Sequence, residues 1–381
     1  MSNFSRPRVV LCAPGFPSSR DDSDKPFLLN HALALVSAGS DVTVVCPAVP
    51  GLPSRQTVEG VEVVRVRYAP RRFETLAATG SMYREARGLQ SVFVLPMILT
   101  LILRVILESR KKKPLVVHGH WWVPGGFVAV VANFFVKTHS VVHLHGSDSV
   151  VANNSVMRWL ARWVMRSATS CLAVSDALAE WGCEVSSRDV EVCPMPIAEE
   201  FGRRRKIPPP DGPIVGVGRL VREKGFDTLL RAVAQIEIAD RPKLVIIGEG
   251  EEREALVYEA DSLGVDLLLV GSLSPEKVAD WYLEARFVVV PSRREGFGLV
   301  AAEAAACGRA VVGTRVGGLP ELIEHKVSGL LVEADDEDEL SEAIGSVELN
   351  WGSAGPERVV WLSKERHAQY LISLYSRLDS R

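Results

Sequence analysis

Several signatures of common protein classes are missing from this sequence. Its six cysteines contain no CxxC pair, so buried, reduced thiols explain them better than a metal or disulfide framework does. No GxxxxGK[ST] phosphate loop occurs, and the run VGVGRLV (215–221) has a valine where GxGxxG needs its third glycine. A P-loop enzyme and a dinucleotide-dependent dehydrogenase are therefore both disfavoured.

Secretory and membrane-spanning signals are also missing. The amino end, MSNFSRPRVVLCAPGF, has too short an apolar core for a leader and no small-residue cleavage site, so we expect a cytoplasmic protein. The longest apolar run, VFVLPMILTLIL (92–103), is shorter than the about 20 residues that a spanning helix needs. We expect it to form a buried helix. The alternative is an interfacial helix whose basic end, SRKKK (109–113), touches anionic lipid at the inner face of the membrane.

A strong excess of positive or negative charge is missing too. The formal net charge is −3, although residues 1–200 carry 21 Lys and Arg against 17 Asp and Glu, and the remainder is acidic. This mild asymmetry suits a first half that meets an anionic partner, but it is too small to indicate nucleic acid. On charge alone, an ordinary solvated surface is the simpler explanation of the balance.

What the chain does contain is a regular alternation of β-branched runs and amphipathic runs. Strands that are apolar on both faces, with helices between them, predict parallel sheets covered on both sides. A polar, proline-rich stretch at 198–212 predicts a linker, after which the alternation restarts. The sequence thus predicts an α/β fold of two doubly wound, Rossmann-like domains, 1–197 and 213–360, that face each other across a cleft. The predicted strands are 8–14, 41–47, 61–67, 114–120, 139–146, 170–175 and 190–195, then 214–220, 243–249, 266–271, 286–292, 310–315 and 329–333.

Two cations follow the first strand of the second domain. Ligands of such sheets bind beyond the carboxyl ends of the strands. Arg219 and Lys224 come directly after Gly218, before a helix expected near Phe226. A planar guanidinium and a mobile ammonium both suit phosphate oxygens, although each residue alone could be an ordinary surface charge.

A pair of carboxylates follows the buried strand at 286–292. In REGFGLVAAE (294–303), Glu295 lies in the loop, and Gly298 permits a tight turn before a helix that starts near Leu299. The free amides of Leu299 and Val300 would then form an anion site at the helix start. Glu303 lies about one turn inside the helix. For an isolated pair, a helix-start carboxylate and a solvated glutamate remain the simpler interpretation.

In combination these segments resemble a known family. The spacing GRLVREKG … IIGEGEER … VGSLS … PSRREGFGLVAAEAAACGRAVVGTRVGGLPELI, which covers 213–333, closely resembles the donor-binding domain of the retaining GT-B glycosyltransferases of family four, the glycosyl transferases group 1. Less tightly, HGHWWVPGGFVA (118–129) and HLHGSD (143–148) are similar to the acceptor-side domain of that family. The segment WLSKERHAQYLISLYSRL (361–378) is similar to its terminal helix, which implies that residues of about 363–381 return to the first domain.

The resemblance implies a role for each donor-side residue. Glu295 and Glu303 match the two acids of an E-x7-E motif, which bind the donor sugar and the ribose. Arg219 and Lys224 would clamp the diphosphate with the amides after Gly298, and the backbone near Leu273 would hold the base. The donor-binding set is Gly218, Arg219, Lys224, Gly248, Glu249, Leu273, Ser274, Glu295, Gly298, Leu299, Val300 and Glu303.

On the acceptor side, the resemblance implies that His145 lies against the transferred sugar, so the expected catalytic residues are Glu295, His145, Arg219 and Lys224. Acceptor-side candidates are His120, Trp121, Trp122 and Asp148. The two tryptophans could stack on a sugar ring, and three arginines could bind a lipid phosphate; these are Arg158, Arg162 and Arg166. Core packing of the tryptophans and an ordinary solvated position of the arginines explain the same residues equally well.

Two segments depart from the family pattern. The loop GFPSSRDDSDKPF (15–27) has Lys25 and Pro26 where flexible glycines are typical, which puts a phosphate contact from this loop in doubt. The segment PMPI (194–197) stands where many relatives have an Asn-Gly turn, which puts the hinge geometry in doubt.

The implied reaction is a retaining transfer of a hexose from a UDP- or GDP-sugar to a glycan or lipid-linked acceptor. No Asp-X-Asp stands at a strand end, so we expect neither a metal nor another cofactor. A double displacement would need a second acid as nucleophile, and only Asp148 is a candidate, by position alone. We therefore favour attack by the acceptor on the same face of the sugar that the diphosphate leaves. A nucleotide-sugar epimerase and a non-catalytic nucleotide-sugar-binding protein remain alternatives.

Overall fold

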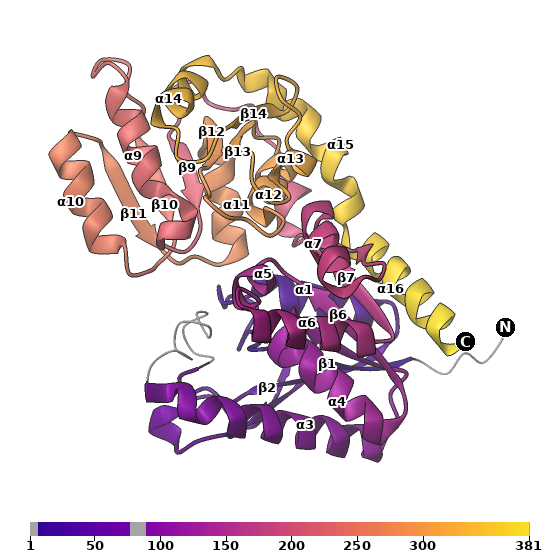
Figure 1. Ribbon diagram of the computed structural model, residues 1–381. Helices are drawn as coiled ribbons and strands as arrows, with labels where there is room; N and C mark the ends of the chain where they lie inside the picture. Colours follow the sequence, from indigo (N-terminus) through magenta and orange to yellow (C-terminus); the bar gives the residue numbers. More distant parts are fainter. Residues whose placement is uncertain (1–6, 77–88, 381) are drawn as a thin grey trace. The chain divides into compact units, whose positions relative to one another are not determined.

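The computed structural model describes residues 7–76 and 89–380, and it confirms two Rossmann-like α/β units (Figure 1). Unit 1 runs to Pro196 and includes the segment from Lys364 on, and unit 2 is Ile197–Ser363. The domain limits expected from the sequence stay a prediction. The first residues of the amino end, for which no leader is expected, lie outside the described residues.

Unit 1 is built on an eight-stranded sheet in the order β3-β4-β2-β1-β5-β6-β7-β8. Its strands pair in parallel except for β3, which pairs antiparallel with β4. The sequence analysis did not predict β3, because RQTV is short, has a single buried residue and lacks an apolar run. The strands are β1 (Arg8–Cys12), β2 (Asp41–Pro47), β3 (Arg55–Val58), β4 (Val61–Val66), β5 (Val116–His120), β6 (His139–Leu144), β7 (Ser170–Ala173) and β8 (Glu191–Val192).

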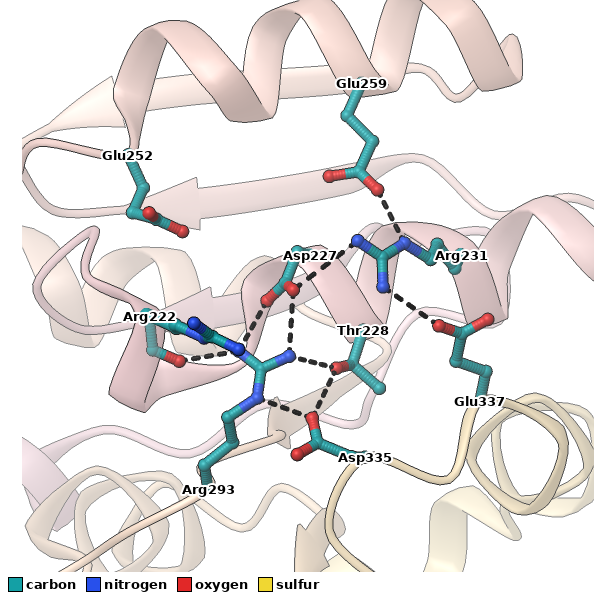
Figure 2. A pocket seen from close by; sticks show the side chains of 9 residues that line it. All are labelled: Arg222, Asp227, Thr228, Arg231, Glu252, Glu259, Arg293, Asp335 and Glu337. Carbon is teal, nitrogen blue, oxygen red and sulfur yellow. Dashed lines mark hydrogen bonds and ion pairs between the residues drawn. The ribbon is translucent and has the colours of Figure 1, made fainter.

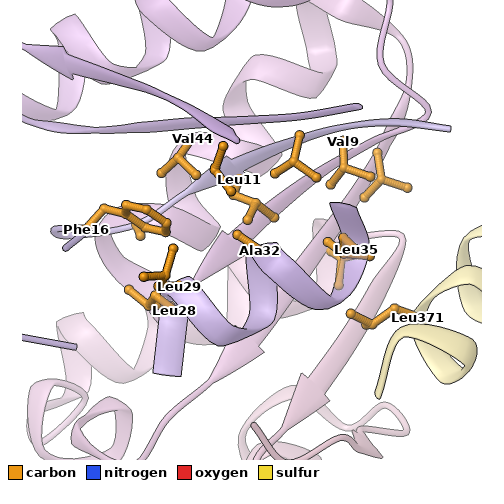
Figure 3. Packing of buried hydrophobic residues seen from close by; sticks show 14 of the residues in the cluster. Val9, Leu11, Phe16, Leu28, Leu29, Ala32, Leu35, Val44 and Leu371 are labelled. Atoms are coloured by element: carbon orange, nitrogen blue, oxygen red, sulfur yellow. The ribbon is translucent and has the colours of Figure 1, made fainter. Parts of the chain in front are cut away.

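Alternate residues of β1 face opposite layers of helices. Val9 and Leu11 pack in a cluster with α1 and α16, as Figure 3 shows. Val10 and Cys12 pack in a second cluster with α3 and α4. This period of two assigns each helix to one face of the sheet. The helices are α1 (Pro26–Ser37), α3 (Val94–Lys111), α4 (Phe127–Val136), α5 (Ser147–Val151), α6 (Ser155–Ser167), α7 (Asp176–Ser186) and α16 (Lys364–Asp379), with short turns at η1 (Arg71–Phe73), η2 (Leu89–Phe93) and η3 (Trp121–Gly126).

The apolar run at 92–103 begins α3, and the expectation that this helix is buried is wrong for one of its faces. Met97, Leu101 and Val105 are fully buried, whereas Leu99 and Leu103 are more than half exposed. A run that is apolar on every face cannot reveal from the sequence which face packs. By length and composition, Gln90–Lys111 is the one helix among the described residues that could cross a membrane.

Unit 2 contains a six-stranded parallel sheet in the order β11-β10-β9-β12-β13-β14. From β9 the chain proceeds outward to β10 and β11, and from β12 it proceeds in the other direction. Strands β9 and β12 therefore flank the topological switch point, outside which ligands of open α/β sheets bind. The strands are β9 (Ile214–Val217), β10 (Leu244–Ile247), β11 (Leu267–Gly271), β12 (Phe287–Val290), β13 (Val311–Thr314) and β14 (Gly329–Val332).

Helices cover both faces of this second sheet, and Ile214 and Val289 lie in its buried core. The longer helices are amphipathic, as α9 illustrates with its buried Leu229 and Val233 on one side. The helices are α8 (Glu200–Arg203), α9 (Phe226–Gln235), α10 (Arg253–Leu263), α11 (Pro275–Glu284), α12 (Leu299–Ala306), α13 (Leu319–Leu322), α14 (Glu337–Ser346) and α15 (Gly355–Val359), with short turns at η4 (Arg222–Lys224), η5 (Leu349–Ala354) and η6 (Val360–Leu362).

Six histidines gather in unit 1, where α1, α16 and the ends of β5 and β6 meet. His31 and His367 share a hydrogen bond of 2.9 Å, and His118 bonds to Tyr375 at 2.6 Å. These contacts join the last helix of the chain to the first and to the central strand β5. The six, called the histidine cluster below, are His31, His118, His120, His143, His145 and His367.

The histidine cluster predicts a stability that falls on acidification. Burial lowers the pKa of every member, to about 3 for His143 and about 4 for His367. The unfolded chain, with pKa values near 6.5, then binds more protons than the folded one, so each clustered histidine costs about 1.4 kcal/mol between pH 7.5 and 5.5. Urea unfolding of His31→Gln should show a pH dependence smaller by about that amount.

His139→Gln is the matched control, because His139 lies outside the cluster. Its unfolding free energy should vary with pH as that of the wild type does. The buried Asp148, whose pKa is raised to about 6, acts in the opposite direction but is common to all three proteins. An unchanged pH dependence in His31→Gln would contradict the account.

Candidate active site

A lysine and a glutamate meet at the switch point of unit 2. Lys224 ends the loop after β9, Glu295 lies in the loop after β12, and these two strands are neighbours. Lys224 Nζ lies 2.6 Å from Glu295 Oε2, and Ser292 Oγ donates to the same oxygen at 3.2 Å. Both side chains remain partly exposed. A cation and a carboxylate are therefore held together, within reach of solvent, where a ligand is expected to bind.

Close backbone contact brings the two loops together. Gly225 has a φ of +67°, and a Cβ atom there would lie 2.0 Å from the carbonyl oxygen of Pro291. No other residue type could occupy this position without moving β12 away from β9. The glycine that follows Lys224 therefore fixes the distance between the two loops.

Arg293 ties the Glu295 loop to α9. Its guanidinium donates to both oxygens of Asp227, at 2.7 and 2.8 Å, and to the carbonyl of Arg222 at 2.6 Å (Figure 2). Burial tends to raise the pKa of Asp227, but its bonds to Arg293 outweigh this effect and leave it below the ordinary value. The sequence analysis missed Arg293, because its partner stands 66 residues earlier in the chain.

The Arg293 network lines a cavity of about 510 Å³, whose side chains Figure 2 draws. Three arginines and five carboxylates surround it. Arg231, for example, is already paired with Glu259 at 2.6 Å and with Glu337 at 3.1 Å. Its excess of negative charge disfavours an anionic ligand, so the cavity belongs to the structural network behind the candidate site.

The other predicted donor residues lie in neighbouring loops of unit 2. Arg219 is exposed in the same loop as Lys224. A Cβ atom at Gly248 would lie 1.9 Å from the carbonyl oxygen of Gly218, so these two loops are in close contact. Glu249 pairs with Arg253 at 3.2 Å and is directed toward α10. Leu273 and Ser274, the two residues expected near the base, follow β11 and directly precede α11.

The predicted helix start is present at α12. Gly298 has a φ of +100° and precedes the helix, and the first amides bonded within it are those of Ala301 and Ala302. The amides of Leu299 and Val300 are thus open to a ligand.

Glu303, which lies one turn further into α12, is partly buried. Burial raises the pKa of Glu303 to about 8, although the neighbouring Tyr282 offsets part of the rise. The carboxyl is therefore mostly protonated at pH 7 and can donate as well as accept a hydrogen bond.

The acceptor-side candidates of unit 1 lie together around Asp148. Three of them are buried and therefore cannot contact an acceptor as expected; they are Asp148, Trp122 and His120. Asp148 is buried and accepts from the amides of Trp122, at 2.8 Å, and His145, at 2.6 Å. Trp122 is fully buried, and its indole donates to the Asp148 carbonyl at 3.0 Å. His120 is also fully buried and bonds to His145 at 2.9 Å. These three position the loop, which leaves Trp121 and His145 partly exposed with ring centroids 4.4 Å apart.

In the first segment that departs from the family pattern, 15–27, the backbone of a lysine adopts a conformation typical of glycine. Lys25 has a φ of +57°, which is the left-handed conformation that a glycine would adopt, and its ammonium pairs with Asp24. Pro26 begins α1. The three arginines named above lie exposed on α6; they are Arg158, Arg162 and Arg166.

Two groups within the histidine cluster could hold a metal ion. One nitrogen from each of His31, His118 and His120 lies within 4.8 Å of the others, and the same holds for His120, His143 and His145. Both nitrogens of His118 are already used, by Tyr375 and His143. Among the fully buried ring nitrogens of the cluster in the described part of the chain, the Nε2 atoms of His31 and His120 lack a partner. As it stands, the cluster is a hydrogen-bonded network rather than a ligand set.

Sequence comparison finds two family models along the chain. Residues 198–365 match the model "Glycosyl transferases group 1", and residues 26–198 match "Glycosyl transferase 4-like domain". The Bacillus subtilis protein named putative teichuronic acid biosynthesis glycosyltransferase TuaC is 30% identical over 88% of each chain. A D-inositol 3-phosphate glycosyltransferase of Corynebacterium jeikeium is 38% identical over 48% of this chain and 47% of its own length.

Solved structures share the fold over nearly the whole chain. Sucrose-phosphate synthase from Thermosynechococcus elongatus superposes with a TM-score of 0.78 at 22% identity, covering 98% of this chain and all of that one. HepE of Anabaena in complex with UDP-glucose superposes with a TM-score of 0.73 at 17% identity, and the match covers 98% of this chain and 100% of that one. At these identities the likeness concerns the fold alone.

The Arg293 network leads to a stability prediction with an internal control. Arg293→Gln should lower the free energy of unfolding by about 2 kcal/mol, because it removes both short bonds to the partly buried Asp227 and leaves only the longer pair with Arg231 at 3.6 Å. Arg294→Gln removes a pair between two half-exposed side chains, Arg294 and Glu223, and should change it by less than about 0.5 kcal/mol. Urea unfolding of both variants tests this. Equal losses would contradict the special position of Arg293.

Proposed function

Since this chain belongs to the glycosyl transferases group 1 family and is a glycosyltransferase, we propose that it moves a hexose from a UDP- or GDP-sugar to a glycan or lipid-linked acceptor. In this proposal the anomeric configuration is kept and no metal takes part. The reaction is expected in the cytoplasm. The contact between Lys224 and Glu295 at the switch point is the observation that carries it.

The proposal gives the two partners of this contact different tasks. Lys224, joined by the exposed Arg219, neutralises the diphosphate of the donor. Glu295 accepts hydrogen bonds from hydroxyl groups of the sugar and holds the ring beside the bond that breaks. Because the pair is already assembled, little reorganisation is needed when the donor binds.

The remaining donor contacts follow from the same loops. The amides of Leu299 and Val300 assist the phosphate, Glu303 binds the ribose, and the backbone at Leu273 and Ser274 holds the base. A protonated Glu303 suits ribose hydroxyls, which both donate and accept. Solved structures that share the fold hold UDP, UDP-glucose or ADP, which supports a nucleoside-diphosphate donor.

The front-face attack is supported by the state of Asp148. Both of its oxygens accept backbone amides, and the side chain is fully buried. It is therefore a poor nucleophile for a double displacement. In the proposal, the acceptor attacks from the side on which the diphosphate leaves, and His145, with Trp121 beside it, contacts the transferred sugar.

The acceptor class rests on the names of relatives. One is named for teichuronic acid biosynthesis and others are named D-inositol 3-phosphate glycosyltransferases, so hydroxyl groups of glycans or phosphorylated polyols are the first acceptors to try. The partly exposed Trp121 offers a stacking surface for such a sugar.

A donor panel tests the proposed function directly. Purified protein with EDTA is incubated with UDP- and GDP-sugars, with and without membrane extract, and nucleoside diphosphate and epimerised sugar are measured together. We expect diphosphate release that depends on the extract and withstands EDTA. Epimerised sugar without release would indicate an epimerase, and activity restored only by Mn²⁺ would contradict the metal-free mechanism.

The phosphate clamp predicts a large kinetic loss. Lys224→Ala and Arg219→Ala should each lower kcat/KM for the productive donor by two to three decades, because losing one preorganised charge costs about 3–4 kcal/mol. Lys277→Ala, at an exposed lysine of α11, is the control and should be near normal. Near-normal kinetics in both clamp variants would refute the assignment.

A further inference from the structure

One face of unit 1 exposes an unusual amount of apolar surface. On α3, four leucines spaced by four residues are between 43% and 64% exposed; they are Leu95, Leu99, Leu103 and Leu107. With a rise of 1.5 Å per residue, they form an oblique stripe that extends about 18 Å along the helix axis. Soluble surfaces carry scattered leucines, but a continuous apolar stripe marks an interaction site.

The neighbouring helices extend this stripe. α4 packs beside α3 over the same side of the sheet and exposes Phe134 and Phe135 by 64% and 60%. α6 packs against α4, where the rings of Phe127 and Trp163 lie 5.8 Å apart, and it exposes Trp159. Figure 1 shows the three helices together on this part of unit 1. The exposed face of α3, α4 and α6 is called the apolar face below.

The charges that these three helices themselves expose have a single sign, although Lys112, just beyond α3, pairs with Asp41 at 2.6 Å. Glu108 is the one carboxylate in the three helices, and it is 2% exposed and paired with Arg55, Arg104 and Lys111. The cations at or just beyond the ends of α3 and α4 and along α6 are exposed; they are Arg110, Lys111, Lys112, Lys113, Lys137, Arg158, Arg162 and Arg166. Thr138 donates to the carbonyl of Pro114, which holds the ends of α3 and α4 close together.

We propose that the apolar face docks on an anionic phospholipid bilayer, with α3 lying in the plane of the interface. Leucines and aromatic rings would enter the boundary between headgroups and acyl chains, and the cations would meet lipid phosphates. The buried side of α3, with Met97 and Leu101 packed on the sheet, keeps the helix from crossing the membrane. This docking goes beyond the proposed function, since it involves no residue of the donor site.

A second copy of the chain is the main competing occupant. In a symmetric dimer the same face would meet itself, so the cations of both copies would come together with no exposed carboxylate on these helices to balance them. An anionic bilayer, by contrast, would bury the apolar stripe and place lipid phosphates beside the cations.

Vesicle sedimentation with the full chain tests the proposal. We expect binding to phosphatidylcholine vesicles with 30% phosphatidylglycerol, weak binding to phosphatidylcholine alone, and a loss of affinity as salt rises. Leu99→Gln with Leu103→Gln should lower the affinity at least about tenfold. Arg110→Gln with Lys113→Gln should lower it less and flatten the salt dependence.

The control replaces two apolar residues of unit 2 that are even more exposed, as Ile207→Gln with Ile238→Gln, and should bind like the wild type. Melting followed by circular dichroism checks that each variant folds. Undiminished binding by the leucine variant would overturn the proposal. So would a wild-type dimer that the leucine variant converts to a monomer, or bound protein that resists extraction at pH 11, which would mean a spanning α3.

Discussion

The arrangement of the donor side depends on one constraint, the contact between the loops that follow β9 and β12. These strands are neighbours on either side of the switch point, although 69 residues lie between Val217, which ends β9, and Phe287, which begins β12. Gly225 lets the loops approach, and Arg293 holds them through Asp227. Lys224 and Glu295 meet as a consequence of this packing. The chemistry of the site is thus a property of the sheet topology as much as of two side chains.

Unit 1 uses its polar groups differently. Its histidine cluster is neutral, hydrogen-bonded and, apart from His145, buried, and it joins α1 and α16 to the strands β5 and β6. Asp148 likewise bonds to the backbone, and it orders the loop that exposes His145 and Trp121. The outer surface of α3, α4 and α6, by contrast, carries apolar side chains and cations that the fold does not require. A surface with this composition suits an anionic bilayer better than water.

Much of this structure can be predicted from local sequence patterns. Apolar runs such as VVV before Pro291 identify strands, and the loops that follow them identify Lys224 and Glu295 as candidates. Features that depend on distant partners could not be predicted. In the sequence, Arg293 is an ordinary loop arginine, and only the fold places Asp227 beside it. The sequence likewise suggests that Trp122 could stack on a sugar, whereas in the structure its indole is buried and donates to the Asp148 carbonyl. The run at 92–103 is apolar on every side, so only packing on the sheet reveals which leucines stay exposed.

The central claim is that the Lys224 position faces the phosphates and the Glu295 position faces the sugar. Exchanging the two, as Lys224→Glu with Glu295→Lys, keeps the ion pair and reverses its direction. The most direct measurement is calorimetric titration of the wild type and this exchange variant with the donor that the wild type binds. The account predicts that the folded variant loses donor binding, because a carboxylate would then face the diphosphate. Equal affinity in the two proteins would contradict it.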